Sequence, residues 1–260
     1  MIDDAYKNHD IFIKLTEYSE FYKNLSESVF RFIAQGTKAA CNINSYLFSS
    51  IQGTLESISD ILIRGRINDS YALLRKYYDS TIINVYSDLY LQDNFSINNF
   101  IVSKIDNWLK GKEQLPEYRE MSNYIRSSEK LKEINNLLYK DKTYKEIRQR
   151  CNDHTHYNFY KNVLLNDNEI YIKDRIKYLD VFEKDLKNIF ILHFSYLFYL
   201  NDYYMSSSDY IDCLDCGLTP EEESQYYVAP FVQDMFNSII KKNRMDLAVK
   251  IIKHTSMQLE

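Results

Sequence analysis

The sequence predicts an all-α protein, an antiparallel helical bundle with a C-terminal helical extension. The 260 residues include only five glycines and three prolines, so architectures that depend on many β-turns lack the residues their turns require. Hydrophobic residues make up 45% of the chain, which is enough to fill a core. Along most of the chain the apolar residues recur at alternating steps of three and four, the period of one helical face.

Three long amphipathic helices are predicted in the first ninety residues. Their apolar faces extend over residues 11–32, 47–62 and 71–89. The second helix is expected to end near Gly65, because glycine is favoured just beyond a helix C-terminus. The short connection that follows predicts that the second and third helices are antiparallel neighbours.

Between residues 95 and 140 the apolar pattern is less regular. It predicts a helix at about 101–109, a loop at GKEQLPE and a helix at 128–138, which together form a small helical insertion over the bundle. A helix through the stretch RQRCNDHTHYN follows, and then a polar turn at NDNE. The apolar face of the next helix extends over residues 172–200 and predicts the central helix of the bundle.

The C-terminal part is predicted to contain two more helices after a serine-rich break at MSSSD. The string Thr219-Pro220-Glu221-Glu222 has the pattern of a capping box and predicts a helix start. Pro230 would interrupt or kink that helix, because proline lacks a backbone N–H. A last helix is predicted at about 245–253. We therefore expect a helical bundle over residues 1–205, with its insertion at about 95–140, and a helical extension over 206–260 that packs on the bundle.

Charge and cysteine usage narrow the class of protein. Acidic residues outnumber basic ones by 37 to 32, a net charge of −5, which argues against a surface built for nonspecific duplex binding. The polar N-terminus has no secretory signal, and the longest apolar run, at 189–200, is too short to cross a membrane. No association with membranes is therefore expected. The four cysteines lack framework spacing, which together with the missing export signal predicts reduced thiols in a cytoplasm.

A lone CxxC motif lies at Cys213 and Cys216. Structural zinc normally takes four ligands, and no second CxxC or nearby Cys/His pair is present. A thioredoxin-type motif would need a βαβ setting, whereas this neighbourhood is predicted to be a loop before a helix. We therefore expect two reduced cysteines beside a turn, with neither a metal nor a cofactor.

The stretch RQRCNDHTHYN, residues 148–158, holds two arginines and two of the five histidines. On a helix, residues four apart share a face, so Arg150 lies beside His154 and Asn152 lies beside His156. Histidine can transfer a proton near neutral pH and arginine can hold a phosphate, so such a cluster could cleave RNA without a metal through attack by the ribose 2′-hydroxyl. The alternative is structural: exposed arginines, with Asn152 and His156 fixing helix register inside the bundle.

Two further polar positions lie on predicted apolar helices. Arg75 and Asp79 are four residues apart and are expected to form an ion pair that orients the bundle, although Arg75 could also reach the histidine-bearing helix. His193 lies on the apolar face of the predicted central helix. It is expected to be a core histidine with its hydrogen bonds satisfied.

Two stretches resemble the signature helices of the HEPN superfamily. They are LLRKYYDSTIINVYSDLY and IRQRCNDHTHYN, and the resemblance covers about residues 40–200. The family pattern is an arginine followed four to six residues later by a histidine, which both Arg150–His156 and Arg148–His154 fit. The string CNDHTHYN favours His156 as the family histidine and Arg150 as its arginine, with His154 as an auxiliary residue.

The resemblance implies a helical bundle that dimerises so that two copies of the motif face one cleft, often acting as a metal-independent endoribonuclease in toxin or antiphage systems. It implies that Arg150 binds phosphate, His156 handles the proton and Asn152 positions either group. Further RNA contacts are expected from Arg148, Asn158 and Arg75. Homodimerisation, RNA and a protein partner such as an antitoxin are therefore expected.

The angle between the two motif residues sets a condition on catalysis. A straight helix places Arg150 and His156 about 120° apart, so their convergence requires a helix end or residues of a partner chain. The alternative function is a noncatalytic all-helical interaction or dimerisation module, which the acidic net charge favours.

Overall fold

The regular structure of the protein is helical. The computed structural model describes residues 2–33, 43–96, 98–99, 101–166 and 174–260. Its long helices are α2 (Ile11–Ile33), α3 (Ile43–Leu62), α4 (Ile67–Asn94) and α10 (Arg175–Leu200), and a short α1 (Asp4–Lys7) precedes them. The described residues contain no β-sheet, only two isolated bridges, so the predicted all-α class is confirmed.

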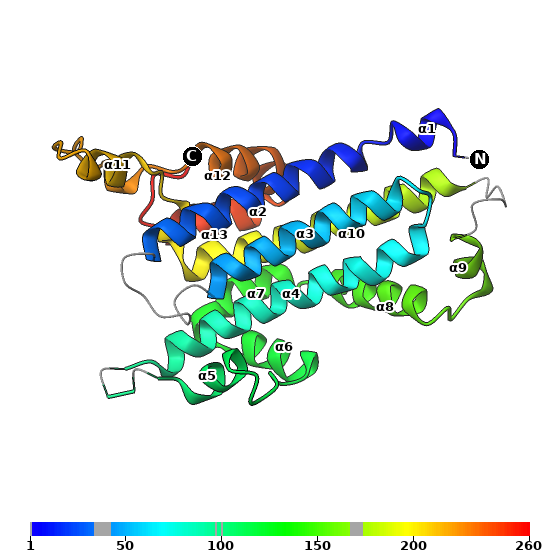
Figure 1. The fold of residues 1–260 in the computed structure, drawn as a ribbon, viewed down its shortest axis with the longest axis horizontal. Helices are drawn as coiled ribbons and strands as arrows, with labels where there is room; N and C mark the ends of the chain where they lie inside the picture. The colour runs from blue at the N-terminus through cyan, green and yellow to red at the C-terminus, as the bar shows by residue number, and fades with distance from the viewer. Residues whose placement is uncertain (1, 34–42, 97, 100, 167–173) are drawn as a thin grey trace.

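The four long helices lie side by side in an elongated bundle (Figure 1). α2 packs on α3, α3 on α4, and α4 on α10. α3 and α4 run in opposite directions, as their short connection predicts. Gly65 in that connection has φ +77, and a Cβ there would lie 2.9 Å from Cδ1 of Ile2. The positive φ therefore favours glycine at this turn, and a Cβ there would require the Ile2 side chain to shift.

Aromatic side chains fill the interface between α2 and α10. Tyr18 stacks on Phe190 with ring centroids 4.4 Å apart, and Phe21 meets Phe190 edge-on at 5.1 Å. Offset and edge-to-face ring pairs add to the free energy gained by apolar burial. The tyrosine content of the chain is thus largely used in packing at this interface and elsewhere in the core.

A chain of hydrogen-bonded polar side chains crosses this apolar core. Its members are Tyr77, Tyr22, His193, Asn84, Asn44 and Asp88, which come from α2, α3, α4 and α10. His193 is fully buried, and its Nδ1 lies 2.7 Å from the Tyr22 hydroxyl while its Nε2 lies 2.8 Å from Oδ1 of Asn84. The prediction of a satisfied core histidine is confirmed. A fully bonded network of this kind fixes the relative register of the helices that supply it.

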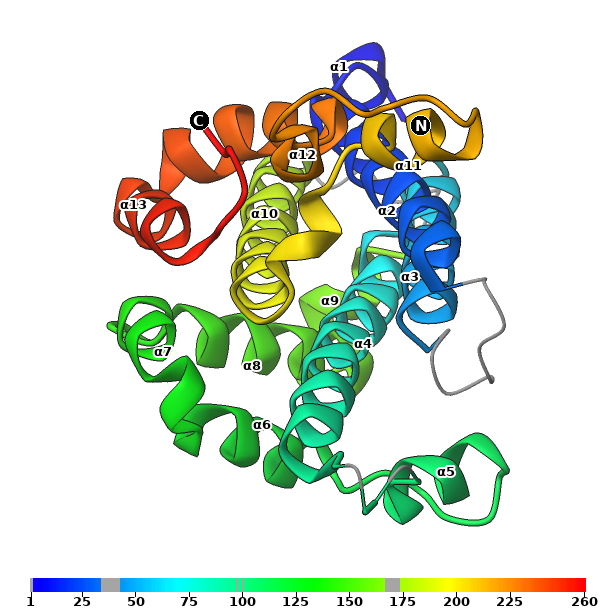
Figure 2. The same ribbon diagram turned by 90° about the vertical axis from the view of Figure 1, so that its left-hand side faces the viewer.

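Four short elements follow α4. They are α5 (Ser103–Leu109), α6 (Tyr118–Ser127), η2 (Glu129–Leu131) and α7 (Lys132–Leu138). Figure 2 shows α6 reaching α4, α7 further from α4, and α5 near the end of α4. α5 and α7 match the predicted helices. α6 was not predicted, because only Met121 and Ile125 of its ten residues are buried, which leaves too little apolar periodicity to see.

The predicted helix through the polar stretch is α8 (Thr143–Thr155), and it is followed by a short α9 (Tyr160–Leu164). Residues 167–169 of the predicted NDNE turn and the predicted start of the next helix at 172 lie outside the described residues.

The C-terminal residues form several short helical elements. They are η3 (Asp202–Met205), α11 (Asp209–Asp215), η4 (Ser224–Tyr226), α12 (Pro230–Met235), η5 (Phe236–Lys241) and α13 (Met245–His254). The predicted helix start at Thr219 is wrong: residues 218–221 are irregular, and Glu223 has φ 67. Pro230 does not interrupt a helix but begins α12, because its missing N–H has no intrahelical partner in the first turn. α13 matches the predicted last helix.

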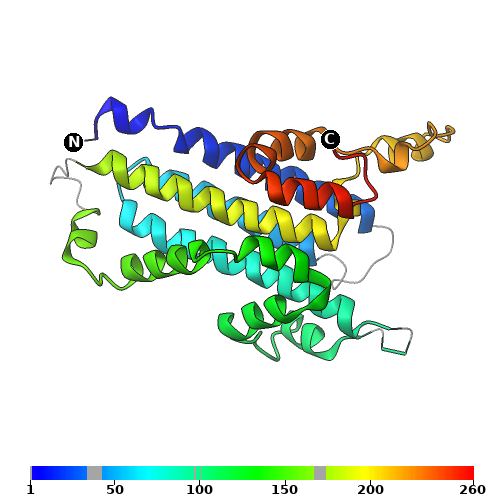
Figure 3. The same cartoon turned by 180° about the vertical axis from the view of Figure 1, so that it is seen from behind.

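The C-terminal helices pack on the bundle, as Figure 3 shows from behind. α12 contacts α2, and α13 contacts α10 and α7. Cys213 lies in α11 and Cys216 caps it, and both thiols are free. Among the described residues, no helix combines the length and the apolar character needed to cross a membrane.

Candidate functional site

α8 carries the polar stretch and lies against α4 and α10. Its buried side chains follow steps of three and four and face the bundle: Tyr144, Ile147, Cys151 and His154. This apolar stripe fixes the rotation of the helix. It therefore decides which polar residues of the stretch lie at the core, at the edge or in solvent.

Arg150 lies at the edge of α8 that faces α10. Its Nε donates to Oδ2 of Asp185 at 2.7 Å and its Nη2 to Oδ1 at 3.1 Å, a two-pronged ion pair. The Asp185 side chain is 3% exposed, and burial raises the pKa of its carboxyl while the bonds from Arg150 oppose that rise. Arg150 is thus committed to a buried carboxylate of its own chain.

His154 lies inside the bundle. Its ring stacks on Tyr71 with centroids 3.9 Å apart, and its Nδ1 lies 2.9 Å from Oδ1 of Asn68. An amide oxygen only accepts, so Nδ1 carries the proton. Burial lowers the pKa of His154 to about 4, which keeps the imidazole neutral at pH 7. In this position His154 supports packing.

Arg148 and Arg75 share one carboxylate. Arg148 pairs with Asp79, and its guanidinium lies over the Tyr118 ring, 3.1 Å from the centroid. Arg75 Nε lies 3.6 Å from Asp79, so the predicted pair within α4 is confirmed and is joined to the histidine-bearing helix. Asp79 thus fixes α8 against α4 through two arginines.

Asn152 lies between these two edges of α8. Its Oδ1 is buried and has no hydrogen-bond partner in the described part of the chain. A buried acceptor without a partner costs free energy unless a ligand or water satisfies it. Asn152 is also one of the residues that line a pocket between α6 and α8.

The end of α8 turns the chain into solvent. His156 is the exposed C-cap, and Tyr157 adopts a left-handed backbone with φ 49, which is uncommon for a non-glycine residue. Asn158 is exposed, and its Nδ2 donates to Oδ1 of Asp153 at 2.8 Å.

Three aromatic side chains project at this end: Tyr157 is 47% exposed, Phe159 53% and Tyr160 76%. Lys161 Nζ lies 5.7 Å from the Phe159 ring centroid. We call residues 156–161 the α8-end surface. It combines exposed rings, an imidazole and a cation.

The predicted site residues therefore divide between core and surface. Arg150 and His154 take part in bundle packing, while His156 and Asn158 lie at the exposed end. The partners Asp185 and Asn68 were missed, although Asp185 is an acid on the otherwise apolar face predicted for residues 172–200, which is a detectable signal. The exposed rings were missed because a sequence does not distinguish an exposed tyrosine from a packed one.

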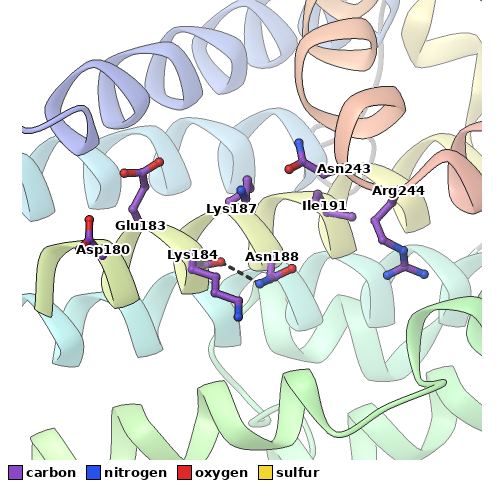
Figure 4. Close-up of a pocket in the computed structure, with 8 residues that line it drawn as sticks. All are labelled: Asp180, Glu183, Lys184, Lys187, Asn188, Ile191, Asn243 and Arg244. Carbon is purple, nitrogen blue, oxygen red and sulfur yellow. Dashed lines mark hydrogen bonds between the residues drawn. The ribbon is translucent and has the colours of Figure 1, made fainter. Parts of the chain in front are cut away.

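A hollow on the outer side of α10 carries charges of both signs (Figure 4). Asp180 lies at one end and accepts a bond from His9 at 3.1 Å. Arg244 lies at the other end and pairs with Asp246 at 2.8 Å. Since its charges at both ends are already paired within the protein, this hollow is not the candidate site.

Metal ligation finds no support in the described part of the chain, where no group of three or more His, Cys, Asp or Glu residues could hold a metal ion. Comparisons with protein-family models, curated proteins and solved structures gave no match. The site is therefore interpreted from its own geometry.

The buried imidazole of His154 predicts an acid-sensitive fold. Histidine in the unfolded chain titrates near pH 6.5, while burial lowers the pKa of His154 to about 4. Between these values the unfolded state binds a proton that the folded state does not, so stability falls as the pH falls. His154→Phe keeps a ring on Tyr71 and removes this proton uptake.

We expect wild type to lose about 2 kcal/mol more than His154→Phe between pH 7 and pH 5. Denaturant unfolding at the two pH values measures this difference. An equal loss in both proteins would show that His154 titrates normally in the folded state.

Proposed function

We propose that the protein is a HEPN-like RNA-binding protein and that it binds single-stranded RNA at the α8-end surface. The observation that supports this proposal is the exposure of Tyr157, Phe159 and Tyr160 within four consecutive residues. Every nucleobase has a π-face, so exposed rings bind unpaired bases by stacking without sequence preference. Lys161 and His156 add donors for phosphate beside these rings.

The net charge of −5 is compatible with this mode of binding. Base stacking on aromatic rings depends less on phosphate contacts than duplex binding does, so a local cation beside the rings of the α8-end surface suffices. Asn158 contributes a polar edge to the same surface. Arg148 and Arg75 share Asp79 and are proposed to make only weak additional phosphate contacts, because that carboxylate already neutralises part of their charge.

Replacing Tyr160 by alanine is expected to weaken RNA binding about tenfold, because stacking contributes roughly 1–3 kcal/mol per base. Fluorescence anisotropy with a labelled oligouridine measures the dissociation constant. Tyr203→Ala is the matched control, since Tyr203 is also exposed, at 50%, but lies in η3. Equal affinity of wild type and Tyr160→Ala for RNA would contradict base stacking at the α8-end surface. An equal loss of affinity in Tyr203→Ala would contradict it too.

Metal-independent RNA cleavage is a second candidate, favoured by the solvent exposure of His156. An exposed imidazole can exchange a proton with a ribose 2′-hydroxyl. Because Arg150 is bonded to Asp185, a second cation for the transition state would come from the partner chain of the homodimer that the HEPN resemblance implies.

The same RNA samples test cleavage when they are incubated with a chelator. Wild type is expected to cut varied RNAs, and His156→Ala to bind them without cutting. If wild type leaves them intact, or if His156→Ala cuts equally well, the catalytic role of His156 is wrong. RNA binding by the rings is then judged separately by the anisotropy measurement.

A noncatalytic interaction or dimerisation module remains the alternative function. The bonds of Arg148, Arg150 and His154 within the bundle favour it, because they assign a packing role to three of the four arginines and histidines in residues 148–158. In that case the exposed rings are a protein interface, for a second copy or for a partner such as an antitoxin. Light scattering on wild type and Tyr160→Ala distinguishes this module from the RNA-binding function. A wild-type dimer that Tyr160→Ala abolishes, in a protein that binds no RNA, supports the module.

A further inference from the structure

A groove of ≈ 850 Å³ lies where the C-terminal extension meets the last turns of α2. Its lining comes from residues 24–30 of α2 and from residues 206–215 and 229–231 of the extension, and we call it the α2–α11 groove. α11 and α12 lie on the side of the bundle formed by α2 (Figure 1). All of its lining residues lie outside residues 40–200, so the HEPN resemblance does not extend to this groove.

Backbone hydrogen bonds hold the wall of the groove that the extension supplies. The N–H of Ser207 donates to the carbonyl of Tyr227 at 2.8 Å, and the N–H of Ala229 donates to the carbonyl of Met205 at 2.7 Å. α12, which follows Ala229, packs on α2. The groove is therefore preformed, and a ligand that enters it does not have to order its walls.

The groove exposes apolar side chains from both of its sides. Phe30 of α2 is 43% exposed, and Ile211 and Phe231 are half-buried. The ring of Phe231 also contacts Phe21 of α2, with centroids 5.7 Å apart, so it connects the groove to the core. Apolar surface gathered in a groove is typical of a site that another molecule covers.

Four carboxylates border this apolar surface: Glu27, Asp209, Asp212 and Asp215, all exposed. Among the described side chains that line the groove, none is a lysine or an arginine. Asp209 accepts a bond from Oγ of Ser207 at 2.8 Å, and none of the four acids forms an ion pair within the described part of the chain. Uncompensated carboxylates repel one another and attract a cationic ligand.

The spacing of the acids favours a chain of cations over a single ion. No group of three or more His, Cys, Asp or Glu residues could hold a metal ion in the part of the chain that the structure describes. Asp209 and Asp215 are about 9 Å apart along the axis of α11, at 1.5 Å per residue. An extended peptide covers a similar length, about 10 Å, in three residues. Lysine and arginine also cover apolar surface with their stems while their charged ends reach carboxylates.

Asn24 adds a polar contact point within the groove. It is half-buried, and its side chain makes no hydrogen bond to the described residues. A primary amide offers a donor and an acceptor together, which matches the N–H and C=O groups of a peptide backbone. Apolar rings, separated carboxylates and a free amide are thus the contacts that a basic peptide requires.

We propose that the α2–α11 groove docks a basic segment of a protein partner in an extended conformation. An apolar side chain of the segment packs on Phe30 and Phe231. Lysines or arginines on either side of it pair with Glu27 and with the aspartates of α11, and Asn24 bonds to its backbone. The proposal goes beyond RNA binding at the α8-end surface and does not depend on it.

Fluorescence anisotropy with the intact protein and a labelled, end-capped peptide KRFRK tests the proposal at low ionic strength. Wild type is expected to bind KRFRK saturably at one site, and to bind the acidic peptide EEFEE at least tenfold more weakly, on the order of the loss of several ion pairs. The peptide KRGRK lacks the apolar side chain and should bind about tenfold more weakly than KRFRK. Added salt should weaken the binding of KRFRK, because it screens exposed charges.

Two variants separate the charged contacts from the apolar ones. Asp212→Asn/Asp215→Asn is expected to weaken KRFRK binding about fivefold, because each exposed ion pair contributes modestly. Phe30→Ala should weaken the binding of KRFRK and leave that of KRGRK unchanged. Asp60→Asn/Glu146→Gln, which makes the same change in charge at exposed positions outside the groove, is the matched control and should bind as wild type does. All three variants should melt as wild type does, since the replaced side chains are exposed.

Four binding results would overturn the proposal: no saturable binding of KRFRK, equal binding of EEFEE, an equal loss in the matched control, or spermidine binding at the groove as tightly as KRFRK. Light scattering tests the remaining occupant. A wild-type dimer that Asp212→Asn/Asp215→Asn abolishes would assign the groove to a second copy of the chain and overturn the proposal too. Because Tyr160→Ala leaves the groove intact, failure of this proposal is distinguishable from failure of RNA binding at the α8-end surface.

Discussion

Replacing Arg150 by methionine is expected to lower the free energy of unfolding by about 3–5 kcal/mol. The variant keeps most of the side-chain stem but leaves the Asp185 carboxylate, 3% exposed, without its cation. A buried, unpaired carboxylate must either pay desolvation or take up a proton. Thermal and denaturant unfolding measure the loss, which corresponds to a decrease in melting temperature of about 10 °C.

A double variant that also replaces Asp185, the partner of Arg150 in the ion pair, is the control. Arg150→Met/Asp185→Leu removes both charges and should recover much of the lost stability, because replacing a buried ion pair by apolar residues is often neutral. An unfolding free energy of Arg150→Met equal to that of wild type would show that the pair does not hold α8 on α10. Arg150 would then be free for the phosphate-binding role that the HEPN resemblance implies.

Replacing His193 by alanine is expected to lower the free energy of unfolding by about 4 kcal/mol. The imidazole connects the Tyr22 hydroxyl to Oδ1 of Asn84 in a fully buried position. Its removal leaves Oδ1 of Asn84 without a partner, which costs about 1–3 kcal/mol, takes one of two bonds from the Tyr22 hydroxyl, which keeps its bond to Tyr77, and opens a cavity. Denaturant unfolding measures the loss.

His156→Ala is the matched control for this variant, because His156 is exposed, caps α8 and makes no side-chain hydrogen bond to the described part of the chain. It should change stability by less than about 0.5 kcal/mol. Similar losses in the two histidine variants would contradict the division between buried and exposed histidines.

The long helices could be predicted from sequence because each buries a continuous apolar stripe. Periodicity at 11–32, 47–62, 71–89 and 172–200 carries that information without any tertiary contact. α6 was not predicted because its two buried residues do not form an apolar stripe. The helix predicted at Thr219 failed because a capping box is a local signal, and Ala229 is bonded instead to Met205 from a distant part of the chain at 2.7 Å.

The candidate site was less predictable for a different physical reason. Spacing places Arg150 and His154 on one face of a helix, but only the packing against α10 and α4 shows that Asp185 and Asn68 already bind them. The pocket between α6 and α8 joins Arg119 and Arg126 of α6 to Lys142 and Lys145, which follow only after η2 and α7. Clusters assembled by tertiary packing are invisible to patterns read along a single chain.

The residues of the Arg/His motif differ in their surroundings: Arg150 and His154 pack in the bundle, while His156 lies at the exposed end of α8. The inner residues fix the helix, and that rigidity holds the exposed rings of the α8-end surface in place. Under the proposed function, Arg150 and His154 are expected to affect RNA binding only indirectly, through stability, whereas Tyr160 and Lys161 should affect it at unchanged stability.

The most direct test of RNA binding at the α8-end surface is ultraviolet cross-linking of single-stranded RNA to the intact protein, followed by mass spectrometry of the cross-linked peptides. The proposed function predicts that cross-links concentrate on Tyr157, Phe159 and Tyr160. Cross-links confined to other parts of the chain, or an absence of cross-links under conditions in which RNA is bound, would contradict it.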